Sequence, residues 1–269
     1  MPRSTDHALS FGRNVGDYDR GRPSYPAEAV DWILEQAEPT HPADPTRPAD
    51  PAHPAEPAHP ADPRVVDLGA GTGKFTAALV DRGLRVVAVE PDALMRERLT
   101  TNLPTVTALE GSGEHLPLDD ASAALVTVAQ AWHWVDVDAT SREVARVLEA
   151  GGALALVWNI RDADVEWVAR LGEVMGASEA EKYDSVTPPV GAPLERQAYR
   201  EFRWVNEVTR EQFFAMVTSR SYVITMADAE RDEMLARLGK LLDTHPDLAG
   251  RTSYPMPYVT RVTIARVAA

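Results

Sequence analysis

An apolar run that ends in an acid is followed by three glycines at alternate positions, in the stretch VVDLGAGTGKF (residues 65–75). Gly69, Gly71 and Gly73 remove side chains from this segment, so its backbone can turn sharply and come close to a ligand. In a doubly wound sheet, the turn after the first strand is the usual place for a bound ligand. The residues around the glycines therefore decide what the loop can hold.

Two common nucleotide-binding patterns do not fit this loop. A phosphate-binding P-loop needs a glycine at the position of Leu68 and a serine or threonine at the position of Phe75. The dinucleotide fingerprint needs a glycine at Lys74 or at Thr76, depending on the glycine from which it is counted. A ligand without phosphate is the remaining expectation.

Two acids accompany the glycines. Asp67 precedes the first of them by two residues, and Glu90 ends the next apolar run, about 20 residues beyond the loop. A carboxylate at Glu90 can accept hydrogen bonds from both hydroxyls of a ribose, as the corresponding acid does in dinucleotide folds. Asp67 suits a cationic ligand with an ammonium or sulfonium group. S-adenosylmethionine is such a ligand.

A third group with chemical potential is the segment AQAWHWVD (residues 129–136), which follows another apolar run. His133 is flanked there by two tryptophans, and an imidazole with a pKa near its usual value of about 6.5 suits proton abstraction. We therefore name His133 as the candidate catalytic base. The alternative is that the Trp-His-Trp cluster packs against the cofactor or the next helix, with a structural hydrogen bond to His133.

The elements that must position these residues alternate between short apolar runs and helical patterns. The runs RVVDL, RVVAVE, TVTALE, AALVTVAQ and GALALVW are separated by stretches such as GKFTAALVDRG and SREVARVLEAGG. This alternation predicts a doubly wound α/β fold with a mostly parallel sheet. Gly83, Gly151 and Gly152 are expected to end helices. Two late strands, AYREFRWVNEVT and PYVTRVTIARV, predict an antiparallel edge hairpin that encloses a helical excursion at about residues 209–244.

Composition limits the choice of function. The chain of 269 residues has 44% hydrophobic residues, no cysteine and no long apolar run, which favours a cytoplasmic protein without a membrane span. Its formal net charge of −14 opposes binding to a nucleic-acid backbone. We expect a small-molecule acceptor, no nucleic-acid or membrane partner, no metal, and a monomer or homodimer.

A proline-rich segment separates two parts of the chain. From Pro39 to Pro63 every third residue is proline, which matches the period of polyproline II. The segment carries three histidines, but an exposed spacer is favoured over a metal site, and a polyproline-binding partner is the other alternative. The expected organisation is an N-terminal arm and helix (1–37), the insert (38–63) and the main domain (64–269).

The motifs VVDLGAGTGKFT, VVAVEPD, GSGEHLPL and REVARVLEAGGALALV together resemble those of class I S-adenosylmethionine-dependent methyltransferases. The similarity is to the small-molecule branch, methyltransferase type 11, which includes trans-aconitate and ubiquinone-biosynthesis methyltransferases. It covers residues 65–161, with weaker support from YDRGRPSYP near the N-terminus. It implies a Rossmann-like seven-stranded sheet with a helical lid and O-methylation of a hydroxyl or a carboxylate on a small acceptor.

The resemblance also implies a set of cofactor contacts. The glycine loop would line the methionine moiety, the acid after the second strand would hold the ribose, and the GSGE turn would flank the adenine. An N-terminal arm would fold over the cofactor and pair an arginine with its carboxylate. Ser112 departs from the aspartate common in the family. The implied residues are Asp67, Gly69, Ala70, Gly71, Glu90, Pro91, Ser112, Gly113, Glu114, Gln130, Tyr18 and Arg22.

Two alternatives remain at this point. One is a non-catalytic protein that keeps the fold and the cofactor pocket and uses the proline-rich segment for interaction. The other is a nucleic-acid methyltransferase. Exocyclic-amine methylation uses an Asn or Asp followed by Pro-Pro and an aromatic after the fourth strand. Here that place reads QAWHW, and the acidic charge of the chain also opposes this alternative.

Overall fold

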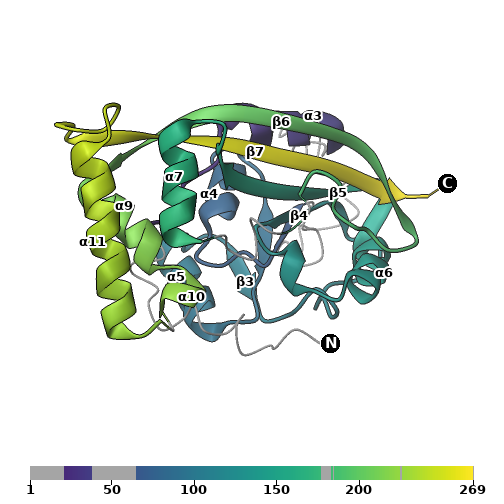
Figure 1. Cartoon of the computed structure of the whole chain (residues 1–269). Helices are drawn as coiled ribbons and strands as arrows, with labels where there is room; N and C mark the ends of the chain where they lie inside the picture. Colours follow the sequence, from purple (N-terminus) through teal and green to yellow (C-terminus); the bar gives the residue numbers. More distant parts are fainter. Residues whose placement is uncertain (1–20, 38–64, 177–182, 184, 225, 269) are drawn as a thin grey trace, which may run out of the picture.

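The computed structural model describes residues 21–37, 65–176, 183, 185–224 and 226–268. Seven strands form a single sheet in the order β3-β2-β1-β4-β5-β7-β6 (Figure 1). The strands are β1 (Val65–Leu68), β2 (Val86–Val89), β3 (Thr107–Leu109), β4 (Ala123–Ala129), β5 (Leu148–Arg161), β6 (Leu194–Thr209) and β7 (Ser253–Val267).

The first five strands in chain order are parallel, and the last two form an antiparallel hairpin at one edge of the sheet. β7 pairs with both β5 and β6, and all of these pairings are antiparallel. The chain builds outward from β1 to β3 and then crosses back to place β4 on the other side of β1. The doubly wound fold and the edge hairpin are therefore confirmed. The carboxyl ends of β1 and β4 meet at the point where the strand order reverses, which is where such sheets bind ligands.

Helices cover both faces of the sheet, because neighbouring residues of a buried strand point to opposite faces. Val65 packs on the side of α3 and α4, whereas Val66 packs on the side of α6. α5 joins the first layer through Leu99, which packs against Ala88 of β2. The helices are α3 (Ala27–Ala37), α4 (Lys74–Val80), α5 (Ala93–Asn102) and α6 (Val137–Val147).

The predicted helical excursion is present between β6 and β7. Its three helices pack with α7 in a hydrophobic cluster of their own, at one end of the molecule (Figure 1). Phe213 and Met216 of α9 are buried there, so the apolar side chains of this helix belong largely to the core of the cluster. The helices are α7 (Glu166–Met175), α9 (Arg210–Thr218), α10 (Ser221–Ile224) and α11 (Asp228–Thr244).

One predicted helix end is wrong. α6 ends at Val147 and the chain is extended from Leu148 onward, so Gly151 and Gly152 lie inside β5 and do not end the helix. Leu148 is 5% exposed and pairs with Ala123 of β4, which shows that sheet pairing and burial override its helical propensity. Gly151 has a φ of +82°, which marks a local irregularity of the strand.

Two further expectations concern a membrane span and the arrangement of the N-terminal and proline-rich segments. No helix in the described part is both long and apolar enough to cross a lipid bilayer. The proline-rich segment and the N-terminal arm up to residue 20, including Tyr18, lie outside the described residues. The expected organisation of those segments therefore stays a prediction.

Candidate active site

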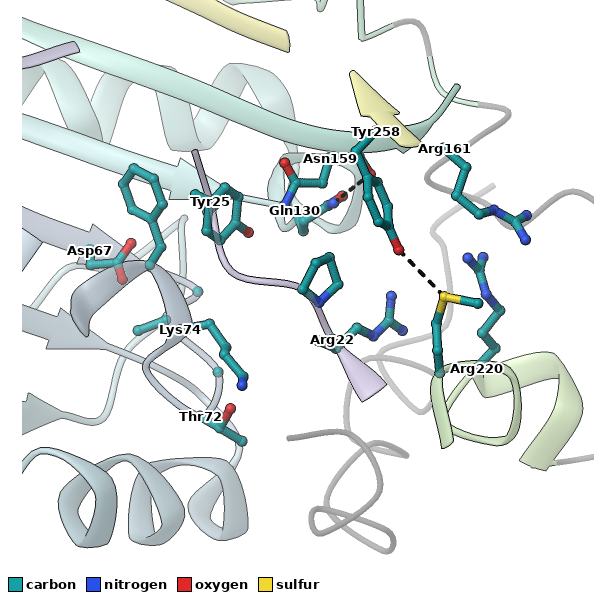
Figure 2. A pocket seen from close by; sticks show the side chains of 17 residues that line it. Arg22, Tyr25, Asp67, Thr72, Lys74, Gln130, Asn159, Arg161, Arg220 and Tyr258 are labelled. Atoms are coloured by element: carbon teal, nitrogen blue, oxygen red, sulfur yellow. Dashed lines mark hydrogen bonds between the residues drawn. The ribbon is translucent and has the colours of Figure 1, made fainter. Parts of the chain in front are cut away.

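A cleft opens at the carboxyl ends of β1, β4 and β5, at the switch point of the sheet (Figure 2). The glycine loop after β1 lines it, together with Ala129 at the end of β4 and Gln130, which follows β4. Asn159 and Arg161 at the end of β5 lie beside them. The cleft contains about 820 Å³ of empty space, part of which is open to solvent.

The glycines of the loop serve different purposes. Gly69 has a φ of +69°, and a Cβ there would lie 2.6 Å from the Cβ of Ala131, so packing alone requires glycine. Gly71 has a φ of +58° and lines the cleft, and a Cβ there would meet no atom of the described residues within 4 Å. The described residues therefore leave the space over Gly71 open.

Glu90 is tied to the same loop. It is 8% exposed, and its Oε2 accepts a hydrogen bond from Gly71 N at 2.8 Å, while its Oε1 accepts one from Asp92 N at 2.9 Å. Asp92 in turn caps α5 by accepting from Leu94 N and Met95 N. Burial raises the pKa of Glu90. Each carboxylate oxygen keeps a second lone pair, so this fixed carboxylate can still accept hydrogen bonds from a ligand.

Asp67 belongs to the lining of the cleft but is fully buried. Its two oxygens accept hydrogen bonds from Thr76 Oγ1 at 2.6 Å and from Thr127 Oγ1 at 2.9 Å. Removal from water raises the pKa of this carboxyl to about 6, although both hydroxyl bonds oppose the rise. A cation beside Asp67 would favour the ionised form and lower this pKa again.

This raised pKa predicts how Asp67 affects stability. The folded protein holds the proton more tightly than the unfolded chain, so the free energy of unfolding should fall as pH rises from about 4 to 6. Above pH 6, the raised pKa corresponds to a loss of about 3 kcal/mol in the free energy of unfolding. Asp67→Asn should flatten that part of the profile, because asparagine does not titrate in this range. Its Oδ1 can accept from one threonine hydroxyl while its Nδ2 donates to the other. Urea unfolding of both proteins from pH 4 to 7 measures this; parallel profiles would contradict the assignment.

A short N-terminal strap, residues 21–26, crosses the cleft and carries Arg22 and Tyr25 (Figure 2). The Tyr25 ring packs edge-on against Phe75, with ring centroids 4.8 Å apart. At its start the strap touches α9 so closely that a Cβ on Gly21 would lie 2.5 Å from Met216 N. The strap therefore joins the glycine loop to the helical excursion.

A chain of hydrogen bonds fastens this strap to the sheet. Asn159 Nδ2 donates to Ser24 O at 2.9 Å, and Asn159 Oδ1 accepts from Thr260 Oγ1 at 2.6 Å. Thr260 Oγ1 accepts in turn from Trp204 Nε1 at 2.8 Å. The main-chain oxygen of Asn159 also accepts from Gln130 Nε2. Asn159 thus links the strap, the cleft residue Gln130 and the edge hairpin.

Asn159→Asp should release the strap selectively. Aspartate can still accept from Thr260, but it offers no N–H to Ser24 O and instead places a negative charge beside this part-buried carbonyl, which costs about 1–3 kcal/mol. Hydrogen–deuterium exchange at residues 21–33 should accelerate at least tenfold. Asn206→Asp, at a half-buried position on β6, is the matched control. Unchanged exchange in Asn159→Asp would show that the strap is held elsewhere.

The structure places the other predicted residues at different distances from the cleft. Arg22, Ala70 and Gln130 line it directly. Gln130 has a φ of +61°, an uncommon conformation for a residue with a side chain and one that is concentrated at functional sites. Pro91 belongs to the turn that holds Glu90, and its main-chain oxygen accepts from Arg96 Nη1 at 2.7 Å.

The predicted adenine-flanking turn is a tight bridge between Ser112 and His115. A Cβ at Gly113 would lie 2.7 Å from Thr140 Oγ1, and Glu114 Oε1 accepts from Asp136 N at 2.8 Å. These contacts fasten the turn to the start of α6. The turn is not part of the cleft lining, and its contact with adenine stays a prediction.

His133 lies in the short helix η2 (Trp132–Trp134) and is 5% exposed. Its ring packs against Trp134 and Tyr183, with ring centroids 4.7 Å and 5.9 Å away. It is not among the described residues that line the cleft. Trp158 stacks on Tyr183, with ring centroids 5.5 Å apart, and is fully buried. The role of His133 as a base stays a prediction.

Sequence reasoning missed several residues of the cleft, above all Lys74, Arg161, Arg220 and Tyr258. One signal was available for Arg161, because it follows Asn159 by two residues and strand alternation places both on the same face. Arg220 and Tyr258 come from the helical excursion and the last strand, and only the folded chain brings them to the carboxyl end of β5.

Comparison with known proteins agrees with this geometry. Residues 66–156 match the profile of a family described as a methyltransferase domain. An uncharacterized methyltransferase of Mycobacterium tuberculosis is 46% identical over 263 residues, which is 97% of this chain and 98% of that protein. An uncharacterized methyltransferase-like protein of Schizosaccharomyces pombe is 27% identical over 259 residues, 93% of each chain.

A solved structure shares the fold. It is that of a putative type II methyltransferase from Anaeromyxobacter dehalogenans, which superimposes with a TM-score of 0.65 at 22% identity and covers 91% of this chain and 97% of its own. A sheet with this strand order, a glycine loop at its switch point and near-full-length relatives of one kind lead to one assignment. The chain belongs to a methyltransferase family and has the Rossmann-like fold of its structural relative.

Proposed function

We propose that this protein transfers a methyl group from S-adenosylmethionine to a small-molecule acceptor, with an oxygen of a hydroxyl or a carboxylate as the favoured site of methylation. The observation that carries the proposal is the open space over Gly71 beside the fixed carboxylate of Glu90. Both lie at the switch point of the sheet. Gly71 leaves room for a part of the ligand that contacts the backbone, and Glu90 can accept hydrogen bonds from a ribose of the same ligand.

Each residue of the cleft has a defined task in this proposal. Gly71 leaves room for the methionine portion, Asp67 favours its positive charge, and Glu90 accepts hydrogen bonds from the ribose hydroxyls. Arg22 on the strap pairs with the carboxylate of the methionine portion. The GSGE turn flanks the adenine. When bound, the cofactor supplies an activated methyl group on its sulfonium.

The protein's own contribution to the reaction is positioning and exclusion of water. Methyl transfer is an in-line displacement, so the acceptor oxygen has to lie in line with the bond that breaks. The strap and α9 cover the cleft from the side opposite the sheet, and the Asn159 bond to Ser24 keeps the strap in place. A carboxylate acceptor is already ionised and needs no base, whereas a hydroxyl acceptor needs one.

The test is methyl transfer by the purified full-length protein. With S-adenosylmethionine labelled in its methyl group, a panel of small hydroxy and carboxylic acids should contain acceptors that gain the label, with equal formation of S-adenosylhomocysteine. Gly71→Ala should lower this transfer. Cofactor binding without transfer to any acceptor would favour a non-catalytic protein, and absence of both would reject the proposal.

A further inference from the structure

Cationic side chains are concentrated in the cleft of an acidic protein. The chain has a formal net charge of −14, yet Arg22, Lys74, Arg161 and Arg220 line the cleft. Asp67 is the only carboxylic acid in the described lining, and its carboxyl is buried with a pKa raised to about 6. Among the described lining residues, cationic side chains therefore outnumber carboxylates, which favours an anionic ligand. Glu90 lies beside the glycine loop, outside that lining.

Two of these cations are held inside the protein. Arg161 is 6% exposed and Arg220 is 8% exposed. Arg161 ends β5, and its Nη1 lies 2.9 Å from Met175 Sδ of α7, whereas Arg220 comes directly after α9. Guanidinium groups stay charged when buried, and each has five N–H donors in a planar fork that matches carboxylate and phosphate oxygens. The sheet and the helical excursion each contribute one such group to the same cavity.

The cofactor does not account for both arginines. In Figure 2, Thr72 and Lys74 lie on one side of Arg22, next to the glycine loop, and Arg161 and Arg220 lie on the other side. Arg22 is therefore better placed for the carboxylate of the cofactor. The Arg161 side of the cleft, with Tyr258 and Met216, is left for the second substrate.

We propose that Arg161 and Arg220 form an anion-binding subsite for the acceptor, which therefore carries a carboxylate or a phosphate at a distance from the atom that is methylated. This inference rests on the proposed function, because it takes the glycine-loop side of the cleft as the cofactor site. Binding of the anion fixes one end of the acceptor and turns its other end toward the methyl donor. It also draws the end of β5 toward the residue that follows α9.

The experiment is calorimetry on the full-length protein saturated with S-adenosylhomocysteine. The probes are benzoate, phenyl phosphate and the neutral benzamide, which share a ring and differ in charge. At least one anion should bind in the millimolar range or tighter, at least tenfold better than benzamide. The ratio of benzoate to phenyl phosphate affinity distinguishes a carboxylate acceptor from a phosphate acceptor.

Variants connect this binding to the two arginines. Arg161→Gln and Arg220→Gln should each weaken anion binding about tenfold or more, since a hydrogen bond to a charged group contributes about 1.5–3 kcal/mol. Arg142→Gln, which removes an exposed arginine from α6, should bind the anion like the wild type. Affinity for S-adenosylhomocysteine, measured on each apo variant, should stay unchanged and shows that the variant is folded.

The outcomes separate this inference from the function on which it rests. If the wild type does not bind S-adenosylhomocysteine, the proposed function fails first and the subsite proposal fails with it. If it does bind, the subsite alone is overturned by equal binding of benzamide, by no binding of either anion, or by unaltered anion binding in both variants. A large loss of S-adenosylhomocysteine affinity, with no loss for 5′-methylthioadenosine, would assign the arginines to the cofactor carboxylate and overturn it as well.

Discussion

Gly71→Ala should weaken the binding of S-adenosylhomocysteine by about 10- to 100-fold. The new methyl group would enter the open space over the loop, where no atom of the described residues lies within 4 Å. Overlap with a ligand in that space costs about 1–3 kcal/mol, as added methyl groups do in packed sites. Calorimetric titration of the folded variant measures the loss.

Backbone strain is the competing explanation for such a loss, and the chain offers a matched control. Gly83 has a φ of +75° and, like Gly71, open space at its Cβ position, but it lies outside the cleft. Alanine at either position should destabilise the fold by about 1–2 kcal/mol. Only Gly71→Ala should lose ligand affinity. Equal affinity in both variants would mean that the space over Gly71 is not used.

Glu90→Ala should lower the affinity for S-adenosylhomocysteine about 100-fold, the second large effect. The change removes an acceptor for two ribose hydroxyls, and it leaves the N–H groups of Gly71 and Asp92 without the oxygens that fix them. Two hydrogen bonds to a charged group together contribute about 3 kcal/mol or more. Calorimetry on the folded variant measures the change.

The ribose contribution can be isolated with a second ligand. In the wild type, the 2′-deoxy analogue of S-adenosylhomocysteine should bind at least tenfold more weakly than the parent compound. In Glu90→Ala the two ligands should bind equally. Glu110→Ala, which removes an exposed acid that bonds to Arg96, should behave like the wild type. A 2′-deoxy penalty that persists in Glu90→Ala would assign the ribose to another residue.

The sheet could be predicted because its physical signals are local. β1, β2 and β4 are short runs of mostly apolar or β-branched residues, and helical patterns between the parallel strands indicate crossovers. The end of α6 could not be predicted in the same way. Leu148 has good helical propensity, and its place in β5 depends on pairing with a strand more than 20 residues away.

The residues of the candidate site also differ in whether the sequence around them carries a local signal. Asp67, Gly71 and Glu90 stand at positions that the strand pattern and the glycine spacing mark directly, and the structure brings them together. Arg220 carries no local signal, because nothing in its neighbourhood in the sequence relates it to β5.

Spacing also cannot separate glycines that serve packing from glycines that serve a ligand. Gly69 and Gly113 are required because Cβ atoms there would collide with Ala131 and Thr140. Gly69 and Gly71 both line the cleft, but of the three glycines only Gly71 has no atom of the described residues within 4 Å of its Cβ position. All three stand in sequence motifs of the family, yet only the folded geometry distinguishes their roles.

The central claim is that the cleft over the glycine loop binds S-adenosylmethionine. Calorimetric titration of the purified full-length protein with S-adenosylhomocysteine, with NAD as the control ligand, tests it most directly. We predict a single site with a dissociation constant of about 10 μM or lower, and no response to NAD. No heat with either ligand, or equal binding of NAD, would contradict the account and leave the glycines as a turn without a ligand.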